Sequence, residues 1–299
     1  MKNMIWRGVM PAITTPFDEQ LNIDHLFAAK HCQWLVDNGC TGIVTPGSLG
    51  ESATLTVDEK LSLWSTVVKA IGDRAPVVAA IASLSTAEAV ELSNRAADLG
   101  CSGLMVLPPY VYQGDWREMK AHLEAVFRAT SLSCMLYNNP VAYGTDFLPE
   151  QIRELAAEHG NFEAVKESST DVRRVTWIKE LSGDRLAIFV GVDDAIVEAI
   201  AVGAMGWIAG LVNAFPKESV DLFEYAMNGE HEKAMRLYHW FLPLLRMDTV
   251  PKFVQLIKLV QQEVGMGNAR VRPPRLELVG PELEEAKRVI REALNTRSK

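Results

Sequence analysis

The chain has 299 residues, of which 48% are hydrophobic and 23% charged, and it carries a formal net charge of −8 at pH 7. This composition is typical of a globular protein with one large core or two modest domains, and it excludes a disordered chain. The acidic balance argues against nucleic acids and anionic membranes, which select a clustered positive surface, so we expect a small molecule or a second copy of the chain as partner.

Short β-rich runs alternate with longer stretches of helical periodicity along most of the chain. Eight strands are predicted, in chain order, at residues 8–17, 41–47, 77–83, 103–109, 133–140, 162–169, 186–193 and 206–213. Between them, apolar residues recur at helical spacing in segments such as residues 24–36, 57–71, 86–99, 116–129 and 149–157. Helices alone follow, at residues 230–245, 250–264 and 281–294.

The alternation of strand and helix predicts the fold. Each strand with its helix takes about 25 to 35 residues, the size of a right-handed βαβ crossover. Eight such units over residues 1–229 predict an α/β fold, a (β/α)8 TIM barrel that forms the catalytic domain. An open doubly wound sheet is the alternative, but its G-x-G-x-x-G nucleotide motif is absent. No flexible linker precedes residues 230–299, so we expect a C-terminal helical extension packed on the barrel.

A lysine stands in the sixth predicted strand, F-E-A-V-K-E-S-S, whose alternate residues Phe162, Ala164, Lys166 and Ser168 are expected to share the inward face. Burial disfavours an ammonium and lowers its pKa, which yields a neutral amine able to attack a carbonyl and form a Schiff base. The alternative is a structural ion pair with a neighbouring glutamate, although strand alternation points both neighbours away. From the strand alone the two interpretations stay open.

Other polar residues follow neighbouring strands, where the active site of a barrel forms. Tyr137, one strand earlier, is a candidate proton relay for Schiff-base chemistry, with a rim aromatic as the alternative. The turn G-S-L-G-E, residues 47–51, offers backbone N–H groups and the Ser48 hydroxyl to a substrate carboxylate, with a plain βα turn as the alternative. For Asp193 and Asp194, we expect one to cap the helix that follows.

The sequence indicates neither a metal site nor a disulfide framework. The histidines fall mostly within predicted helices, and no His/Asp/Glu cluster has ligand spacing. The N-terminus lacks a secretory signal, and the longest apolar passage, Gly203 to Phe215, is shorter than the ~20 residues of a membrane span. We expect a cytoplasmic protein without a metal. Four cysteines are too sparse for a disulfide scaffold or a zinc site and are expected in the core: Cys32, Cys40, Cys101 and Cys134.

The motifs G-S-L-G-E, Y-N-N-P and V-K-E-S-S, in this order, resemble the dihydrodipicolinate synthase / N-acetylneuraminate lyase superfamily across essentially the whole chain. The resemblance implies a (β/α)8 barrel, a homo-oligomer (tetramer or dimer), and a lysine Schiff base with pyruvate or another 2-oxo acid, without a cofactor. It implies Lys166 as the Schiff-base nucleophile, Tyr137 as the proton relay and Ser48 as a carboxylate-binding hydroxyl. The further substrate-binding residues expected are Gly47, Leu49, Gly50, Tyr110, Asn139, Ala142, Ser168, Gly191, Asp193 and Ile208.

The chain departs from the family pattern at Leu49, where a second hydroxyl residue is usual. Two further departures bear on the substrate: Ala142 stands where dihydrodipicolinate synthases have an arginine, and Val111 where they have a second tyrosine. The tract Y-N-N-P-V-A-Y-G-T-D looks more similar to Δ1-pyrroline-4-hydroxy-2-carboxylate deaminases, which implies action on a cyclic imine and release of ammonia and 2,5-dioxopentanoate. The alternatives are dihydrodipicolinate synthase, a pyruvate-dependent aldolase and, in another class, a non-catalytic ligand-binding barrel.

Overall fold

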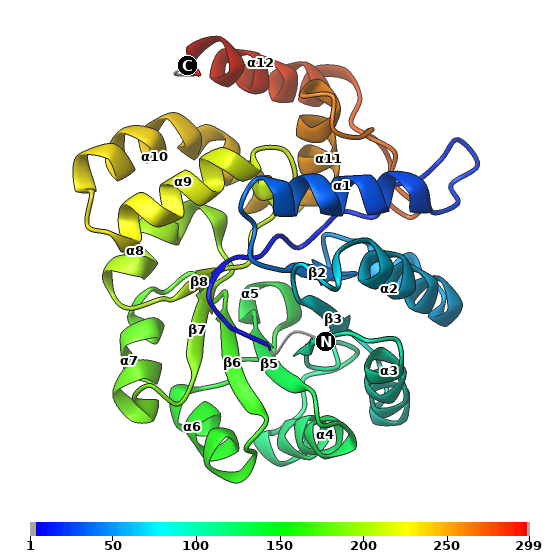
Figure 1. The fold of residues 1–299 in the computed structure, drawn as a ribbon, viewed down its shortest axis with the longest axis vertical. Helices are drawn as coiled ribbons and strands as arrows, with labels where there is room; N and C mark the ends of the chain where they lie inside the picture. Colours follow the sequence, from blue (N-terminus) through cyan, green and yellow to red (C-terminus); the bar gives the residue numbers. More distant parts are fainter. Residues whose placement is uncertain (1–3, 298–299) are drawn as a thin grey trace.

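The computed structural model describes residues 4–297, which form a ring of parallel strands surrounded by helices (Figure 1). The predicted (β/α)8 barrel is confirmed. Within the described residues the strands are β1 Gly8–Val9, β2 Ile43–Thr45, β3 Val77–Ile81, β4 Gly103–Val106, β5 Ser133–Asn138, β6 Phe162–Glu167, β7 Ala187–Val190 and β8 Gly206–Trp207.

The sheet closes on itself. Its strand order is β1-β8-β7-β6-β5-β4-β3-β2, and all the pairs are parallel. Just after β1, a parallel bridge joins Ala12 to Val44 of β2, and the Ile13 N–H donates a 3.0 Å hydrogen bond to the Val44 carbonyl. The first strand is much shorter than predicted, because prolines at positions 11 and 16 have no N–H to extend a ladder.

The helices match the predicted periodicity closely, and several begin at the expected caps. The Thr56 side chain accepts a 3.2 Å hydrogen bond from the Glu59 N–H, and Asp115 caps the helix after β4 in the same way. The α-helices are α1 His25–Asp37, α2 Val57–Ile71, α3 Thr86–Asp98, α4 Trp116–Ala129, α5 Pro140–Tyr143, α6 Pro149–Glu158, α7 Arg173–Ser182, α8 Ile196–Ala201, α9 Pro216–Met227, α10 His231–Leu245, α11 Phe253–Glu263 and α12 Gly280–Thr296. Four 3-10 turns complete them: η1 Ser52–Thr54, η2 Asp193–Ala195, η3 Leu211–Asn213 and η4 Arg246–Asp248.

Two apolar cores lie on opposite faces of the barrel wall. The inner cluster includes Ala164, while the outer cluster, between strands and helices, includes Val165 and Phe162. The prediction that Phe162 shares the inward face is therefore wrong. The register of β5 against β6 shifts at Cys134, and the Phe162 ring stacks on Phe127 of α4 with centroids 5.2 Å apart.

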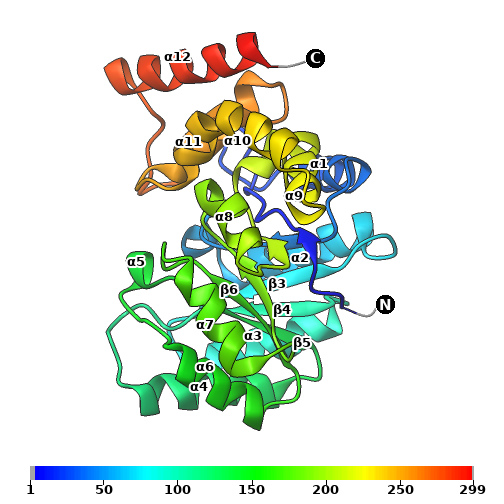
Figure 2. The ribbon, with the colours of Figure 1, turned by 90° about the vertical axis from the view of Figure 1, so that its left-hand side faces the viewer.

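The helices after the barrel cover one end of it. Figure 2 shows α10, α11 and α12 stacked beyond α8 and α9, and the predicted boundary at residue 230 falls between α9 and α10. A buried ion pair of 2.6 Å joins Lys258 of α11 to Glu51, in the turn after β2. Within residues 4–297, no helix combines the length and hydropathy that a membrane crossing requires.

Candidate active site

A cavity of ≈ 490 Å³ opens at the C-terminal ends of the strands, lined by residues that follow several strands and by the segment that leads into α11. It brings together most of the residues that the sequence singles out. Those lining it are Gly47, Ser48, Leu49, Tyr137, Asn139, Ala142, Lys166, Ser168, Gly191 and Ile208.

Lys166 lies on the inner face of β6, opposite Tyr137 in the register of β5. Its side chain is buried, and its Nζ lies 4.0 Å from the centroid of the Tyr137 ring. The two glutamates that flank it bind elsewhere: Glu163 accepts a 2.5 Å hydrogen bond from Ser133, and Glu167 one of 3.0 Å from Asn138. The Lys166 amine forms no ion pair with any residue from 4 to 297, which removes the structural alternative left open by the sequence.

The electrostatics of the cavity act on this amine in opposite directions. Burial lowers the pKa of Lys166 to about 8, while the charges of Asp248 and, less strongly, Asp193 raise it. An amine with this pKa is partly neutral near pH 7 to 8 and can attack a carbonyl.

Tyr137 is held by the residue two positions along the chain. Asn139 Nδ2 donates a 3.0 Å hydrogen bond to the Tyr137 hydroxyl, and Asn139 Oδ1 accepts one of 3.0 Å from the Ala142 N–H. The second bond fixes the orientation of the amide, so the Tyr137 oxygen is an acceptor and its proton is free to be donated. Burial raises the pKa of this phenol.

The turn after β2 forms one wall of the cavity. The Ser48 hydroxyl shares a hydrogen bond with the Tyr143 hydroxyl of α5, and the Tyr143 ring meets Tyr137 edge-on, with centroids 5.8 Å apart. Among residues 4–297, no backbone carbonyl accepts from the N–H groups of Ser48 and Leu49. Two free donors and a hydroxyl suit a carboxylate.

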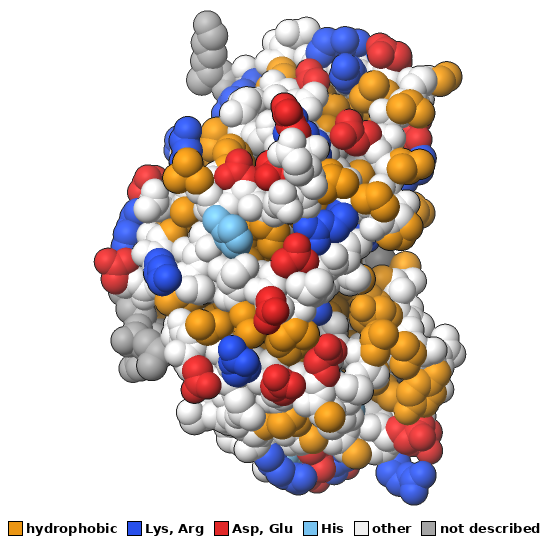
Figure 3. All heavy atoms as spheres, turned by 90° about the vertical axis from the view of Figure 1, so that its right-hand side faces the viewer, with side chains coloured by type: hydrophobic (Ala, Val, Ile, Leu, Met, Phe, Trp, Pro, Cys, Tyr) orange, Lys and Arg blue, Asp and Glu red, His pale blue; other side chains and the backbone are white. Residues whose placement is uncertain are grey.

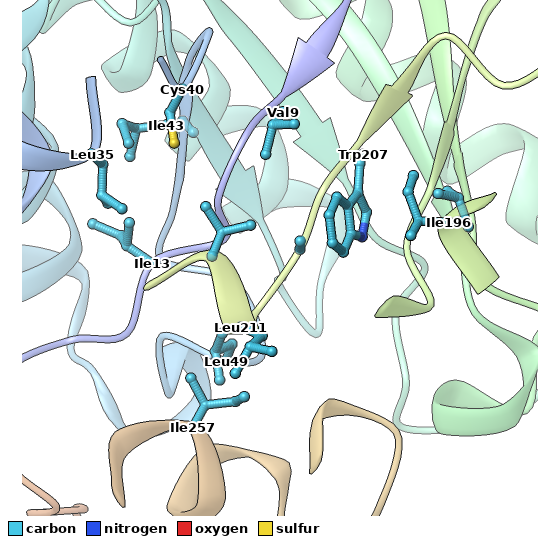
Figure 4. Packing of buried hydrophobic residues seen from close by; sticks show 14 of the residues in the cluster. Val9, Ile13, Leu35, Cys40, Ile43, Leu49, Ile196, Trp207, Leu211 and Ile257 are labelled. Atoms are coloured by element: carbon cyan, nitrogen blue, oxygen red, sulfur yellow. The ribbon is translucent and has the colours of Figure 1, made fainter. Parts of the chain in front are cut away.

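Leucine at position 49 has a packing role. Its side chain is 4% exposed and belongs to the outer core. Figure 4 shows it within the same buried cluster as Leu211, in the loop after β8, and Ile257 of α11. The leucine therefore packs the turn into the core shared with the helical extension.

Three predicted binding residues do not line the cavity. Gly50 is packed against backbone, since a Cβ there would lie 3.0 Å from the Ile13 carbonyl oxygen. Tyr110 is 37% exposed, and its ring lies near that of Tyr143, with centroids 5.9 Å apart. Asp193 is fully buried beneath the cavity floor.

The hydrogen bonds of Asp193 explain its position. Its carboxylate accepts from the N–H groups of Gly210 at 3.1 Å and Leu211 at 2.9 Å, and from Trp207 Nε1 at 3.2 Å. It therefore fixes the loop after β8. The expected helix cap is wrong: neither Asp193 nor Asp194 caps α8 with its side chain, because η2 intervenes.

Gly191 shows why the wall beside Lys166 carries no side chain. A Cβ at this position would lie 2.2 Å from Lys166 Cε and 2.1 Å from Ser168 Oγ. Any larger residue would displace the lysine from its place over Tyr137.

Sequence reasoning missed several cavity residues, among them three with titratable side chains. Tyr143 stands in the quoted Y-N-N-P-V-A-Y tract, where its helical spacing behind Asn139 was the available signal. Asp248 and Arg275 come from the helical extension, and no sequence pattern links them to the strands. The Arg275 guanidinium forms no ion pair with any residue from 4 to 297, so it is available to an anionic ligand.

A group of potential metal ligands lies on the outside of the barrel. Glu124, Glu158 and His159 each place one ligand atom within 4.8 Å of the others. Lys120 binds Glu158 at 2.8 Å, and Arg128 binds Glu124 at 3.2 Å. These cations balance the carboxylates, and the group reads as a surface ion-pair network.

Comparison with known proteins identifies a family and several relatives. The sequence profile of the dihydrodipicolinate synthetase family matches residues 5–293. A 4-hydroxy-tetrahydrodipicolinate synthase of Heliobacterium modesticaldum is 31% identical over 282 residues, covering 94% of each chain. Another, from Methanocaldococcus jannaschii, is 30% identical over 292 residues, covering 97% of this chain and 98% of the relative.

Solved structures give the same result. A crystal structure of a dihydrodipicolinate synthase from Bacillus anthracis superposes with a TM-score of 0.93 at 29% identity, covering 99% of this chain and all (100%) of the other. One from Aquifex aeolicus gives a TM-score of 0.92 at 26% identity, covering 96% and 97% of the two chains. With a matched profile over nearly its whole length and the shared barrel, the chain belongs to the dihydrodipicolinate synthetase family.

Proposed function

We propose that the protein is a lyase that forms a Schiff base between Lys166 and the carbonyl carbon of pyruvate or another 2-oxo acid, or the matching carbon of a cyclic imine. The observation that carries the proposal is the unpaired, buried amine of Lys166 above the Tyr137 ring, at 4.0 Å from its centroid, inside a cavity with free backbone donors. Membership of the family supports it.

The residues suggest an order of events. The substrate carboxylate lies against the turn at Ser48, and the neutral Lys166 amine adds to the carbonyl carbon. Tyr137 donates a proton to the carbonyl oxygen, which leaves as water when the C–N double bond forms. The protonated Schiff base then accepts the electron pair released when a C3 proton is lost, which gives an enamine.

The enamine leads to two candidate reactions. Condensation with aspartate semialdehyde, the dihydrodipicolinate synthase reaction, is favoured by the names of the relatives, which are 28–31% identical to this chain. Ala142 counts against condensation, because dihydrodipicolinate synthases have an arginine at that position. Arg275, from another segment, contributes a guanidinium to the cavity. We therefore place condensation first.

The second candidate is deamination of Δ1-pyrroline-4-hydroxy-2-carboxylate. Lys166 would open the ring at C2, the enamine would expel the C4 hydroxyl, and hydrolysis would release ammonia and 2,5-dioxopentanoate. Ala142 at the cavity wall and Val111 outside it are the observations that favour this reaction. None of the relatives described above carries its name.

A parallel assay separates these reactions. The purified protein is incubated with pyruvate and aspartate semialdehyde, with the hydroxypyrroline carboxylate, and with pyruvate plus other aldehydes, and products are followed by mass spectrometry. Rapid condensation with the semialdehyde would establish the first candidate, and ammonia release the second. Failure of both pyruvate and the hydroxypyrroline carboxylate to leave an adduct on Lys166 after borohydride treatment would refute both.

The rate of Schiff-base formation is expected to rise with pH and then level off. Because the pKa of Lys166 is about 8, the neutral fraction of the amine grows about tenfold per pH unit below that value and saturates above it. The measurement is the initial rate of pyruvate adduct formation between about pH 6 and about pH 10. A rate that keeps rising up to the ordinary lysine pKa would contradict the effect of burial.

Assembly and location stay predictions. Large apolar side chains are exposed in the β4–α4 loop and on α5, namely Tyr110, Val111, Tyr112 and Val141. Figure 3 shows hydrophobic side chains gathered along one edge of the molecule, on both sides of a recess. Such a surface supports a homo-oligomer. The substrates proposed are small metabolites, in keeping with the expected cytoplasmic location.

A further inference from the structure

Asp248 lines the cavity, and the mechanism above gives it no role. It ends η4, in the helical extension, and lines the same cavity as Lys166. Its Oδ1 is buried and accepts no hydrogen bond from any residue between 4 and 297. Since a buried acceptor without a partner is costly, a carboxyl in this state requires an explanation.

The position of this carboxyl is set by the loop after β8. A Cβ on Gly210 would lie 2.0 Å from Asp248 Oδ1, so the carboxyl rests directly on the backbone of that loop. The Gly210 N–H cannot satisfy it, because that group donates to Asp193 at 3.1 Å. The Asp248 carboxyl is thus held by packing, with Oδ1 buried against the loop and without a hydrogen-bond donor among residues 4–297, while the residue itself lines the cavity.

Other acids near the cavity are already engaged. Asp193 accepts three hydrogen bonds and does not line the cavity, and the Tyr143 hydroxyl is paired with Ser48. Tyr137 lies against the lysine, where the Schiff-base carbon forms. Among residues 4–297, Asp248 is the one carboxyl that lines the cavity.

We propose that Asp248 is the acid for the substrate oxygen carried by C4, the carbon next to the enamine carbon, and that it selects substrates with an oxygen there. The proposal rests on the Schiff-base chemistry proposed above. In a dehydration, the enamine pair forms the C3–C4 double bond, the C4–O bond breaks, and the Asp248 proton goes to the departing oxygen to give water. In a condensation, a C3–C4 bond forms, and the aldehyde oxygen takes the carbonyl electron pair and the Asp248 proton.

The electrostatic setting agrees with this role. Burial, and next the charge of Asp193, raise the pKa of Asp248 well above the ordinary range of an aspartate, while Lys166 lowers it. A carboxyl in this environment holds its proton at higher pH than an exposed one, as an acid must. Once the lysine is consumed as a Schiff base, the neighbouring cation is the iminium, and the geometry of the carboxyl against Gly210 is unchanged.

The test compares enamine formation, which needs no oxygen at C4, with the complete reaction, which does. Asp248→Asn keeps the shape of the side chain but cannot supply the acidic proton. Hydrogen–deuterium exchange of the pyruvate methyl group, followed by NMR above the pKa of Lys166, reports Schiff-base and enamine formation alone. We expect exchange within about threefold of wild type, and kcat for the reaction found in the parallel assay lowered about 10²- to 10⁴-fold.

The control variant is Asp194→Asn. Asp194 pairs with Arg246 of η4 at 3.7 Å and lies outside the cavity, so both exchange and turnover should stay near wild type. For a dehydration, the analogue with fluorine in place of the C4 hydroxyl adds a sharper readout, since fluoride leaves without a proton. Asp248→Asn should process that analogue nearly as fast as wild type, whereas a merely structural role would slow both substrates alike.

Two outcomes would overturn the proposal: turnover within about threefold of wild type in Asp248→Asn, or loss of exchange in parallel with turnover. If wild-type protein itself neither exchanges pyruvate nor traps it with borohydride, the Schiff-base function fails, and that failure is visible before any Asp248 variant is made.

Discussion

Replacing Lys166 with alanine is expected to abolish turnover and to remove the adduct that pyruvate and borohydride leave on the protein. In the proposed mechanism the amine forms the covalent bond, and among residues 4–297 Lys166 is the one lysine that lines the cavity. Turnover is measured with the substrate identified in the parallel assay, and the adduct by peptide mass analysis. A variant that keeps more than a small fraction of wild-type turnover would refute the role assigned to Lys166.

The wild-type chain contains its own control for this experiment. Lys258 is also buried, and burial likewise lowers its pKa to about 8, yet it is bound to Glu51 at 2.6 Å and to the Arg270 carbonyl at 2.6 Å. It does not line the cavity. If a lowered pKa alone determined reactivity, both lysines would be labelled, so we expect the adduct on the Lys166 peptide and none on the Lys258 peptide.

A second lysine variant separates chemistry from folding. Lys166→Met fills nearly the same volume and removes the buried amine that pairs with no carboxylate. Its melting temperature is therefore expected to equal or exceed that of wild type while turnover is absent. A large fall in melting temperature would mean that the amine contributes to the fold.

Tyr137→Phe is expected to lower kcat about 10²- to 10⁴-fold, the usual range for loss of a general acid or base. The ring stays beneath the Lys166 amine, so only the hydroxyl that Asn139 holds at 3.0 Å is lost. Adduct formation with pyruvate should slow as well, because carbinolamine dehydration needs the same proton.

Tyr225→Phe on α9 is the matched control for Tyr137. Its ring lies near Lys233, whose Nζ is 5.2 Å from the ring centroid, and it lines no part of the cavity. This variant should be as active as wild type. Equal rates in the two phenylalanine variants would show that the Tyr137 hydroxyl moves no proton in the slow step.

The sequence was sufficient for the barrel and for the pair at its centre. Strand periodicity predicts that Lys166 faces inward, and neighbouring parallel strands place Tyr137 beside it, so local pattern and topology together determine their contact. The predicted orientation of Phe162 was wrong because a register shift between β5 and β6 interrupts the alternation of side chains. No residue type in the two strands indicates this shift.

The part of the cavity wall formed by Asp248 and Arg275 could not be predicted from the sequence, for a different reason. Asp248 and Arg275 enter the cavity because the extension docks on the turn after β2, through the Lys258–Glu51 pair and the apolar core that includes Leu49 and Ile257. Those contacts join residues about 200 positions apart, with Lys258 and Glu51 separated by 207. Side-chain packing between distant segments leaves no periodic trace in a single sequence.

Because of this docking, two separate parts of the sequence form the cavity: the barrel strands and the C-terminal extension. The proposed nucleophile Lys166 and the proposed relay Tyr137 stand on strands of the barrel, while Asp248 and Arg275 stand on a segment that follows the eight strands. A mutant library confined to residues 248–253 and 275 would therefore change which second substrate the cavity accepts. Schiff-base formation at Lys166 would stay the same in every variant. In a laboratory evolution experiment, borohydride labelling of Lys166 would persist through every round while the product changes.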